Sequence, residues 1–218
     1  MKETCGFLPK KGNYQDLAVY KKAEVIYDLT FYFTGRFLKA SKDRTVDQMV
    51  QAARSGKQNI AEGCAAASTS AETEIKLVNV ARASMQELLV DYQDYLRVRN
   101  LTQWPLGDER TTKTQRFCSN HDRSADFMAN IDQRSDEAIA NICITLIHQF
   151  DGIMGKYIAR LEKDFVEQGG IREQMTAARL GYRNNQKERI AELEKENAML
   201  RTKIAELEAL LGQKGGKE

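Results

Sequence analysis

Only a few residues of this chain are of types that could do chemistry at a metal site. Cys118 and His121 are three residues apart, a spacing that allows a thiolate and an imidazole to bind one zinc ion. No second pair of metal ligands accompanies them, so we predict no metal. The other histidine, His148, falls within an apolar helical repeat, and this position favours a core or interface role over catalysis.

Nucleophiles and acid–base pairs are also missing from the sequence pattern. The four cysteines, which include Cys5, Cys64 and Cys143, form no Cys-x-x-Cys pair. The chain contains no phosphate-binding loop, dinucleotide motif, serine-nucleophile motif or H-E-x-x-H motif. Carboxylates are plentiful, but no pair of them stands out as an acid and base. We therefore expect no enzyme activity, no cofactor and no small-molecule substrate.

Basic side chains provide the second kind of chemistry, which is the neutralisation of phosphate groups. Residues 1–42 have a net charge of +4, residues 43–168 of −4 and residues 169–218 of +2. Basic charge therefore gathers near the first predicted helix and over residues 172–189. Ordinary solvated surface cations are the alternative, and a pI near 8.3 is low for a dedicated nucleic-acid binder. The candidate nucleic-acid-binding residues are Lys21, Lys22, Arg36, Lys39, Lys42 and Arg44.

Helical periodicity dominates the elements that must position these residues. Apolar side chains at spacings of three and four predict four long helices, over residues 14–40, 46–66, 70–99 and 135–168. Residues 101–132 are the least periodic, and we predict a long loop there with room for short helix. Arg82 alone interrupts the apolar seam of the third helix, so it needs a carboxylate partner or an interface. The pattern predicts an all-α fold, an antiparallel up-down four-helix bundle followed by a helical extension.

The C-terminal extension carries a heptad repeat typical of a parallel two-stranded coiled coil. Isoleucine at position a with leucine at position d favours two strands, and an asparagine at position a fixes register and dimeric state. In a parallel dimer the charges at positions g and e would pair as Arg189–Glu194, Glu196–Arg201 and Lys203–Glu208. A solvated single helix is the alternative. The predicted interface consists of Ile190, Leu193, Asn197, Leu200, Ile204, Leu207 and Leu211.

These patterns divide the chain into five parts. They are an N-terminal segment (1–13), the bundle (14–168), a basic helical suffix (169–185), the coiled coil (186–212) and a flexible tail (213–218). The first residues lack the apolar stretch of a signal peptide, and no run approaches the length of a membrane span. We expect a cytoplasmic protein that does not contact a membrane.

Two sequence strings resemble the 23S rRNA intervening-sequence protein family of bacterial four-helix bundles. They are RSGKQNIAEG at residues 54–63 and RASMQEL at residues 82–88, with a Ser-x-x-x-Glu segment at residues 70–74 between them. The resemblance covers residues 14–99 and extends over the fourth helix to residue 168. Residues 144–174 resemble the subgroup that bears a four helix bundle suffix domain.

The resemblance implies residue roles and partners. The family is similar to the accessory protein of diversity-generating retroelements, a basic pentameric barrel that binds nucleic acid and a reverse transcriptase. This sequence departs from that pattern in its acidic bundle and its dimeric heptads. The residues taken from the motif or its neighbourhood, which we interpret as interhelical polar contacts and close helix packing, are Arg54, Asn59, Glu62, Gly63, Arg82 and Glu87.

The sequence thus predicts a non-enzymatic oligomer that acts as an accessory or scaffold protein. It would assemble with itself through the bundle and the coiled coil, and with a protein or nucleic-acid partner. The alternative is an RNA- or DNA-binding accessory protein of a reverse transcriptase or retroelement system. A metal-dependent enzyme that uses Cys118 and His121 is a third, weaker reading.

Overall fold

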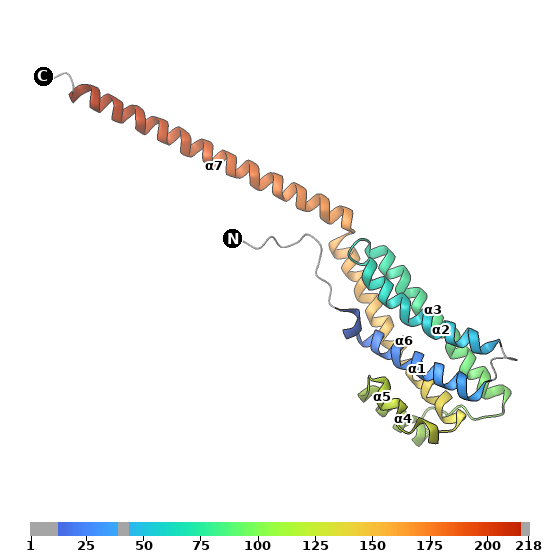
Figure 1. Cartoon of the computed structure of the whole chain (residues 1–218). Coiled ribbons are helices and arrows are strands. Elements are labelled where there is room, and N and C mark those ends of the chain that lie inside the picture. The colour runs from blue at the N-terminus through green and yellow to red at the C-terminus, as the bar shows by residue number, and fades with distance from the viewer. Residues whose placement is uncertain (1–12, 39–43, 215–218) are drawn as a thin grey trace. The chain divides into compact units, whose positions relative to one another are not determined.

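The computed structural model describes residues 13–38 and 44–214, with the side chains of 168 and 209–214 left out (Figure 1). Helices make up most of this part of the chain, and none of it forms a strand, so the all-α prediction is confirmed. Two 3-10 turns, Tyr14–Asp16 and Ile131–Gln133, accompany the helices. The helices are α1 Ala18–Phe37, α2 Thr45–Ala66, α3 Ala71–Val98, α4 Glu109–Asn120, α5 Ser124–Met128, α6 Asp136–Gln168 and α7 Ile171–Lys214.

The core of the first unit, residues 1–171, lies among the four long helices α1, α2, α3 and α6. Helix α1 packs against α2 and α6, and α3 packs against the same two helices (Figure 1). Each of the four contributes fully buried side chains, such as Phe33 from α1, Met49 from α2, Tyr92 from α3 and Phe150 from α6. The apolar seams that the sequence shows are therefore the faces that meet.

The ends of the long helices follow local chemistry. Ser70 and Ser135 are the N-caps of α3 and α6, where each hydroxyl oxygen accepts a hydrogen bond from a backbone N–H of the first turn. Gly169 ends α6 with a φ of 70°, a conformation that glycine adopts without strain. The first helix is shorter than predicted, because α1 ends at Phe37; residues 39 and 40 lie outside the described residues.

The segment between α3 and α6 is more helical than the predicted long loop. It contains α4, α5 and the second 3-10 turn. Helix α4 buries only Thr111 and Cys118, seven residues apart, and all its other side chains except the partly buried Phe117 are polar. Two buried residues in twelve produce no visible amphipathic period, which explains why the sequence pattern missed this helix.

One window within Asp136–Glu208 is long and apolar enough to cross a membrane by length and composition. However, 61% of that window is buried inside the protein. Such a window is what the core helix of a soluble protein produces, and α6 contacts α1, α3 and α4.

The second unit, residues 172–218, holds α7 apart from its first residue. At 1.5 Å per residue, its 44 residues measure about 66 Å. From residue 175 to residue 208 every side chain is exposed. The apolar residues of the heptads therefore lie in solvent in the single chain.

Candidate functional site

The predicted phosphate-binding residues of α1 hold the 101–134 segment in place. Lys21 forms an ion pair with Asp122 at 3.2 Å. Arg36 donates hydrogen bonds to the carbonyl oxygens of Ile131 (3.2 Å) and Asp132 (2.8 Å), and its guanidinium stacks over Phe37. These cations are therefore engaged with the protein itself.

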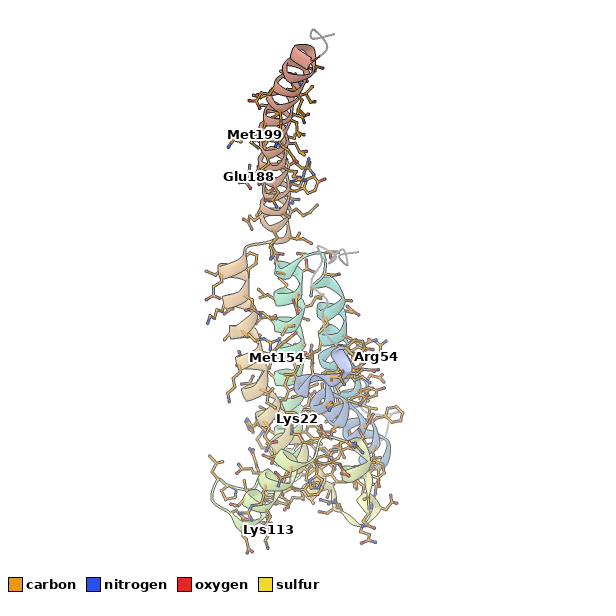
Figure 2. The ribbon with its side chains drawn as sticks, turned by 90° about the vertical axis from the view of Figure 1, so that its left-hand side faces the viewer. Lys22, Arg54, Lys113, Met154, Glu188 and Met199 are labelled. Carbon is orange, nitrogen blue, oxygen red and sulfur yellow. The ribbon has the colours of Figure 1, made fainter. Side chains whose placement is uncertain are left out.

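Lys22 departs furthest from its predicted surface role, because only 6% of it is exposed (labelled in Figure 2). Its Nζ donates to the carbonyl oxygen of Cys118 at 2.7 Å and to Oε1 of Gln149 at 3.0 Å. Burial lowers the pKa of this amine. Lys22 thus joins α1 to α4 and α6, and it does not present its charge to a ligand on the surface.

The other three candidate residues, Arg44, Lys39 and Lys42, do not complete a shared phosphate site within the described residues. Arg44 is exposed and precedes α2 as its N-cap residue. Lys39 and Lys42 lie outside the described residues. The structure therefore brings together no continuous basic face among the described members of this set.

A cleft of about 760 Å³ lies between α4, α6 and residues 103–106. Two α6 side chains hold the extended chain that forms its rim. Asn141 accepts from the backbone N–H of Trp104 at 2.8 Å, and Glu137 accepts from the indole N–H at 3.0 Å. The sequence gives only one sign of this clamp, which is that Glu137 and Asn141 are four residues apart on one helix face.

The cleft lacks an arrangement that could do catalysis. Its one histidine, His148, is exposed, and the other lining side chains are mainly amides, hydroxyls and apolar groups. The ring of His121 stacks on Phe117, and its Nδ1 lies 2.9 Å from the carbonyl oxygen of that residue. Burial raises the pKa of Cys118 to about 12, so its thiol is protonated near neutral pH. Among the described residues no three His, Cys, Asp or Glu side chains could hold a metal together.

The motif residues on α2 and α3 lie on both sides of a close helix contact. A Cβ at Gly56 would lie 2.5 Å from Cε and 2.8 Å from Cγ of Met85, and one at Gly63 would lie 3.3 Å from Val78. Asn59 donates to the backbone and hydroxyl oxygens of Ser55, and that hydroxyl contacts Ser84 of α3 at 2.9 Å. Small residues therefore set the distance between the two helices.

Three of the charged motif residues lie at the surface, in contrast to our interpretation of them as buried interhelical contacts. Arg54, Glu62 and Glu87 are exposed, and Arg54 is labelled in Figure 2. Glu87 borders a polar cleft of about 430 Å³ between α2 and α3. The carboxylates of Glu62 and Glu87 are therefore in contact with solvent and need no cationic partner inside the bundle.

Arg82 has the carboxylate partner that its position in the seam predicts. Its guanidinium binds Asp151 of α6 through two bonds, of 2.7 and 3.0 Å, and Gln86 donates to the same carboxylate at 3.0 Å. The bond from Arg82 holds the pKa of Asp151 below its ordinary value. This bidentate pair connects α3 to α6 and is partly buried, with side chains 42% and 28% exposed.

We expect Gly56→Ala to lower the free energy of unfolding by about 1 kcal/mol, because overpacking against Met85 exceeds the gain in helix propensity. Gly152→Ala in α6 is the matched control. It adds the same methyl group where nothing lies within 4 Å, and should raise the free energy of unfolding by up to about 1 kcal/mol. Urea denaturation measures both changes. Equal gains for both variants would contradict the close-contact interpretation.

The predicted coiled-coil positions on α7 form an exposed apolar stripe. Ile190, Leu200 and Leu207 are 53%, 52% and 55% exposed. Leu193 and Ile204 lie on the same stripe, and Asn197 between them donates to the Leu193 carbonyl oxygen. The side chain of Leu211 lies outside the described residues.

The comparison with family models covers the helices that carry the motif. Residues 15–103 match the model described as 23S rRNA-intervening sequence protein. This region belongs to that family. The match spans α1, α2 and α3, so the resemblance read from the Asn59 and Arg82 strings is confirmed there. Neither the comparison with curated proteins nor that with solved structures found a match.

Proposed function

We propose that this intervening-sequence family protein is a non-enzymatic scaffold that self-associates and holds a protein or nucleic-acid partner in the cytoplasm. In this proposal α1, α2, α3 and α6 form an antiparallel bundle. Helix α7 joins two chains as a parallel coiled coil. The observation that carries the proposal is the apolar stripe on α7.

An exposed stripe of this kind needs a cover. Large apolar side chains at every a and d position except Asn197 would remain in water along about 26 Å of helix between residues 190 and 207. Burial against a second copy contributes about 25 cal/mol for each Å² removed from water. Asn197 favours pairing with its own copy, because an asparagine at position a opposite an apolar residue lacks a partner.

Charges beside the stripe favour the parallel arrangement. Arg189, Glu196 and Lys203 at g would each meet an opposite charge at e of the second chain. In the single chain Arg189 pairs instead with Glu192 at 3.1 Å. Each exposed pair is worth only a few tenths of a kcal/mol, so these pairs select the partner rather than supply the affinity.

Sedimentation of the full-length chain tests the proposal. We expect a species of twice the 24.8 kDa chain mass at micromolar concentration. A chain that ends at Gln186 should lose this coiled-coil association. If both chains run as the same monomer, the scaffold proposal fails.

Substitutions in the full chain sharpen this test. Leu193→Asp with Leu200→Asp places four carboxylates in the dimer seam and should abolish the association. Met199→Asp with Thr202→Asp is the matched control, because it adds the same charge at positions outside the seam. Both control positions are exposed in the single helix. Association that survives the seam variant but not the control would contradict the predicted register.

Nucleic-acid binding, in an accessory role to a reverse transcriptase or retroelement, is the second candidate function. One observation favours it: the exposed basic stretch at the start of α7. The α1 cations are poor targets for its test, because charge reversal at Lys22 or Arg36 would disrupt packing.

A further inference from the structure

The heptad positions of α7 can be counted back toward the N-terminus of the helix, where the residues at a and d are no longer apolar. Counting back from Ile190, positions a and d fall on three arginines, a threonine and a glutamine. These residues replace the apolar seam: Arg172, Thr176, Arg179, Arg183 and Gln186. The apolar seam therefore begins at Ile190, although the helix itself is continuous from Ile171.

This arrangement has a physical consequence in a parallel dimer. If the seam stayed closed, each Arg183 would face its own copy at position a, and each Arg179 its own copy at position d. Like charges that face each other repel, and their burial leaves them without partners. The two helices must therefore separate N-terminal to Ile190, with six arginines lining the inner faces of the fork.

The arginines at these a and d positions are available to a ligand. The side chains of Arg172, Arg179 and Arg183 are exposed, and none forms an ion pair with a residue that the structure describes. The same holds for Lys187, at the neighbouring position e. By contrast, Lys21, Lys22 and Arg36 of α1 are engaged by the protein. Four exposed cations therefore share one face of this helix.

We propose that this arginine fork binds the phosphate backbone of double-stranded DNA. The inference rests on the proposed parallel dimer. The basic face extends over about 22 Å from residue 172 to residue 187. The major groove of B-form DNA is about 12 Å wide and admits an α-helix, so two diverging basic helices can contact one duplex from both sides.

Double-stranded RNA fits this fork less well. Its A-form major groove is deep and narrow, and helical side chains cannot enter it. The basic residues are already part of a continuous helix, so the chain does not have to fold on the duplex. No acidic side chain lies at positions a or d between residues 172 and 186 to oppose the phosphates.

Fluorescence anisotropy with a labelled 20-base-pair DNA duplex tests the proposal in the full-length chain. Six or more phosphate contacts predict a loss of about 10³ in affinity between 50 and 200 mM salt. Arg172→Glu, Arg179→Glu and Arg183→Glu together should weaken binding at 50 mM salt by about 100-fold or more. Absence of binding by a dimeric wild-type chain would overturn the fork and leave the scaffold intact.

A matched variant separates the fork from general charge attraction. Lys156→Glu, Arg160→Glu and Lys163→Glu change the same number of charges on the exposed surface of α6. This control should bind DNA within about threefold of the wild type. Equal weakening by both triple variants, or equal affinity for double-stranded RNA or poly-glutamate, would overturn the assignment to B-form DNA. Sedimentation of each variant reports the dimer separately, so a monomeric wild type would overturn the scaffold as well.

Discussion

Phe33→Ala is expected to lower the free energy of unfolding of the helical core by about 4 kcal/mol. Phe33 lies on α1, and none of its surface is exposed. Its ring meets those of Tyr95 and Tyr92 edge-on, with centroids 4.7 and 5.2 Å away. Truncation would remove these aromatic contacts and leave a cavity between α1 and α3.

The same helix supplies a matched control. Phe31, two residues away, is 62% exposed and makes one tilted ring contact with Tyr27. Phe31→Ala should change the free energy of unfolding by no more than about 0.5 kcal/mol. Urea denaturation followed by circular dichroism measures both variants. Similar losses for the two would contradict the assignment of core and surface faces on α1.

Raising the pH from 9 to 11 is expected to lower the free energy of unfolding by about 5 kcal/mol, through Cys118 and Cys143 alone. Burial raises the pKa of each thiol from 9.0 to about 12. The unfolded chain therefore releases these protons above pH 9, while the folded chain keeps them. Because the unfolded state loses protons first, stability falls as the pH rises from 9 toward 12.

Other buried groups modify this slope. Burial raises the pKa of Tyr92 as well, and the destabilisation by that phenol begins near pH 10. Lys22 acts in the opposite direction, because burial lowers the pKa of its amine. The folded chain releases that proton first as the pH rises. This group therefore raises the free energy of unfolding until the pH reaches the ordinary pKa of 10.5.

Urea denaturation at pH 8, 9, 10 and 11 under reducing conditions measures the slope. Cys118→Ala with Cys143→Ala should reduce its steepness, whatever the variant does to stability at pH 8. An unchanged slope in this double variant would show that other groups govern the alkaline loss.

Most of the helical architecture could be predicted because its signals are local. The seam through Val78, Met85 and Tyr92 repeats every three or four residues, and buried residues occupy it in α3. Serine caps at Ser70 and Ser135 mark helix starts through hydrogen bonds within three residues. Helix α4 was missed because only Thr111 and Cys118 are buried in it.

The functions of the basic residues depended on contacts distant in sequence. Lys22 and Lys21 are adjacent, yet Lys22 bonds to Cys118 inside the protein and Lys21 pairs with Asp122 at its surface. Their places in the helical repeat differ, because Lys22 lies in the same row as Val19 and Ile26, which are buried, and Lys21 does not. The partners that receive the buried amine, the Cys118 carbonyl oxygen and Gln149, come from α4 and α6 and depend on the tertiary structure.

The all-α class and the long helices of the core follow from local sequence, because side-chain periodicity and capping act over a few residues. The pairing of Arg82 with Asp151, the packing of Met85 beside Gly56 and the packing role of the α1 cations emerge only when distant segments meet in the fold. These pairings join residues 29 to 96 positions apart, and burial and geometry select each one from many partners of equal chemistry.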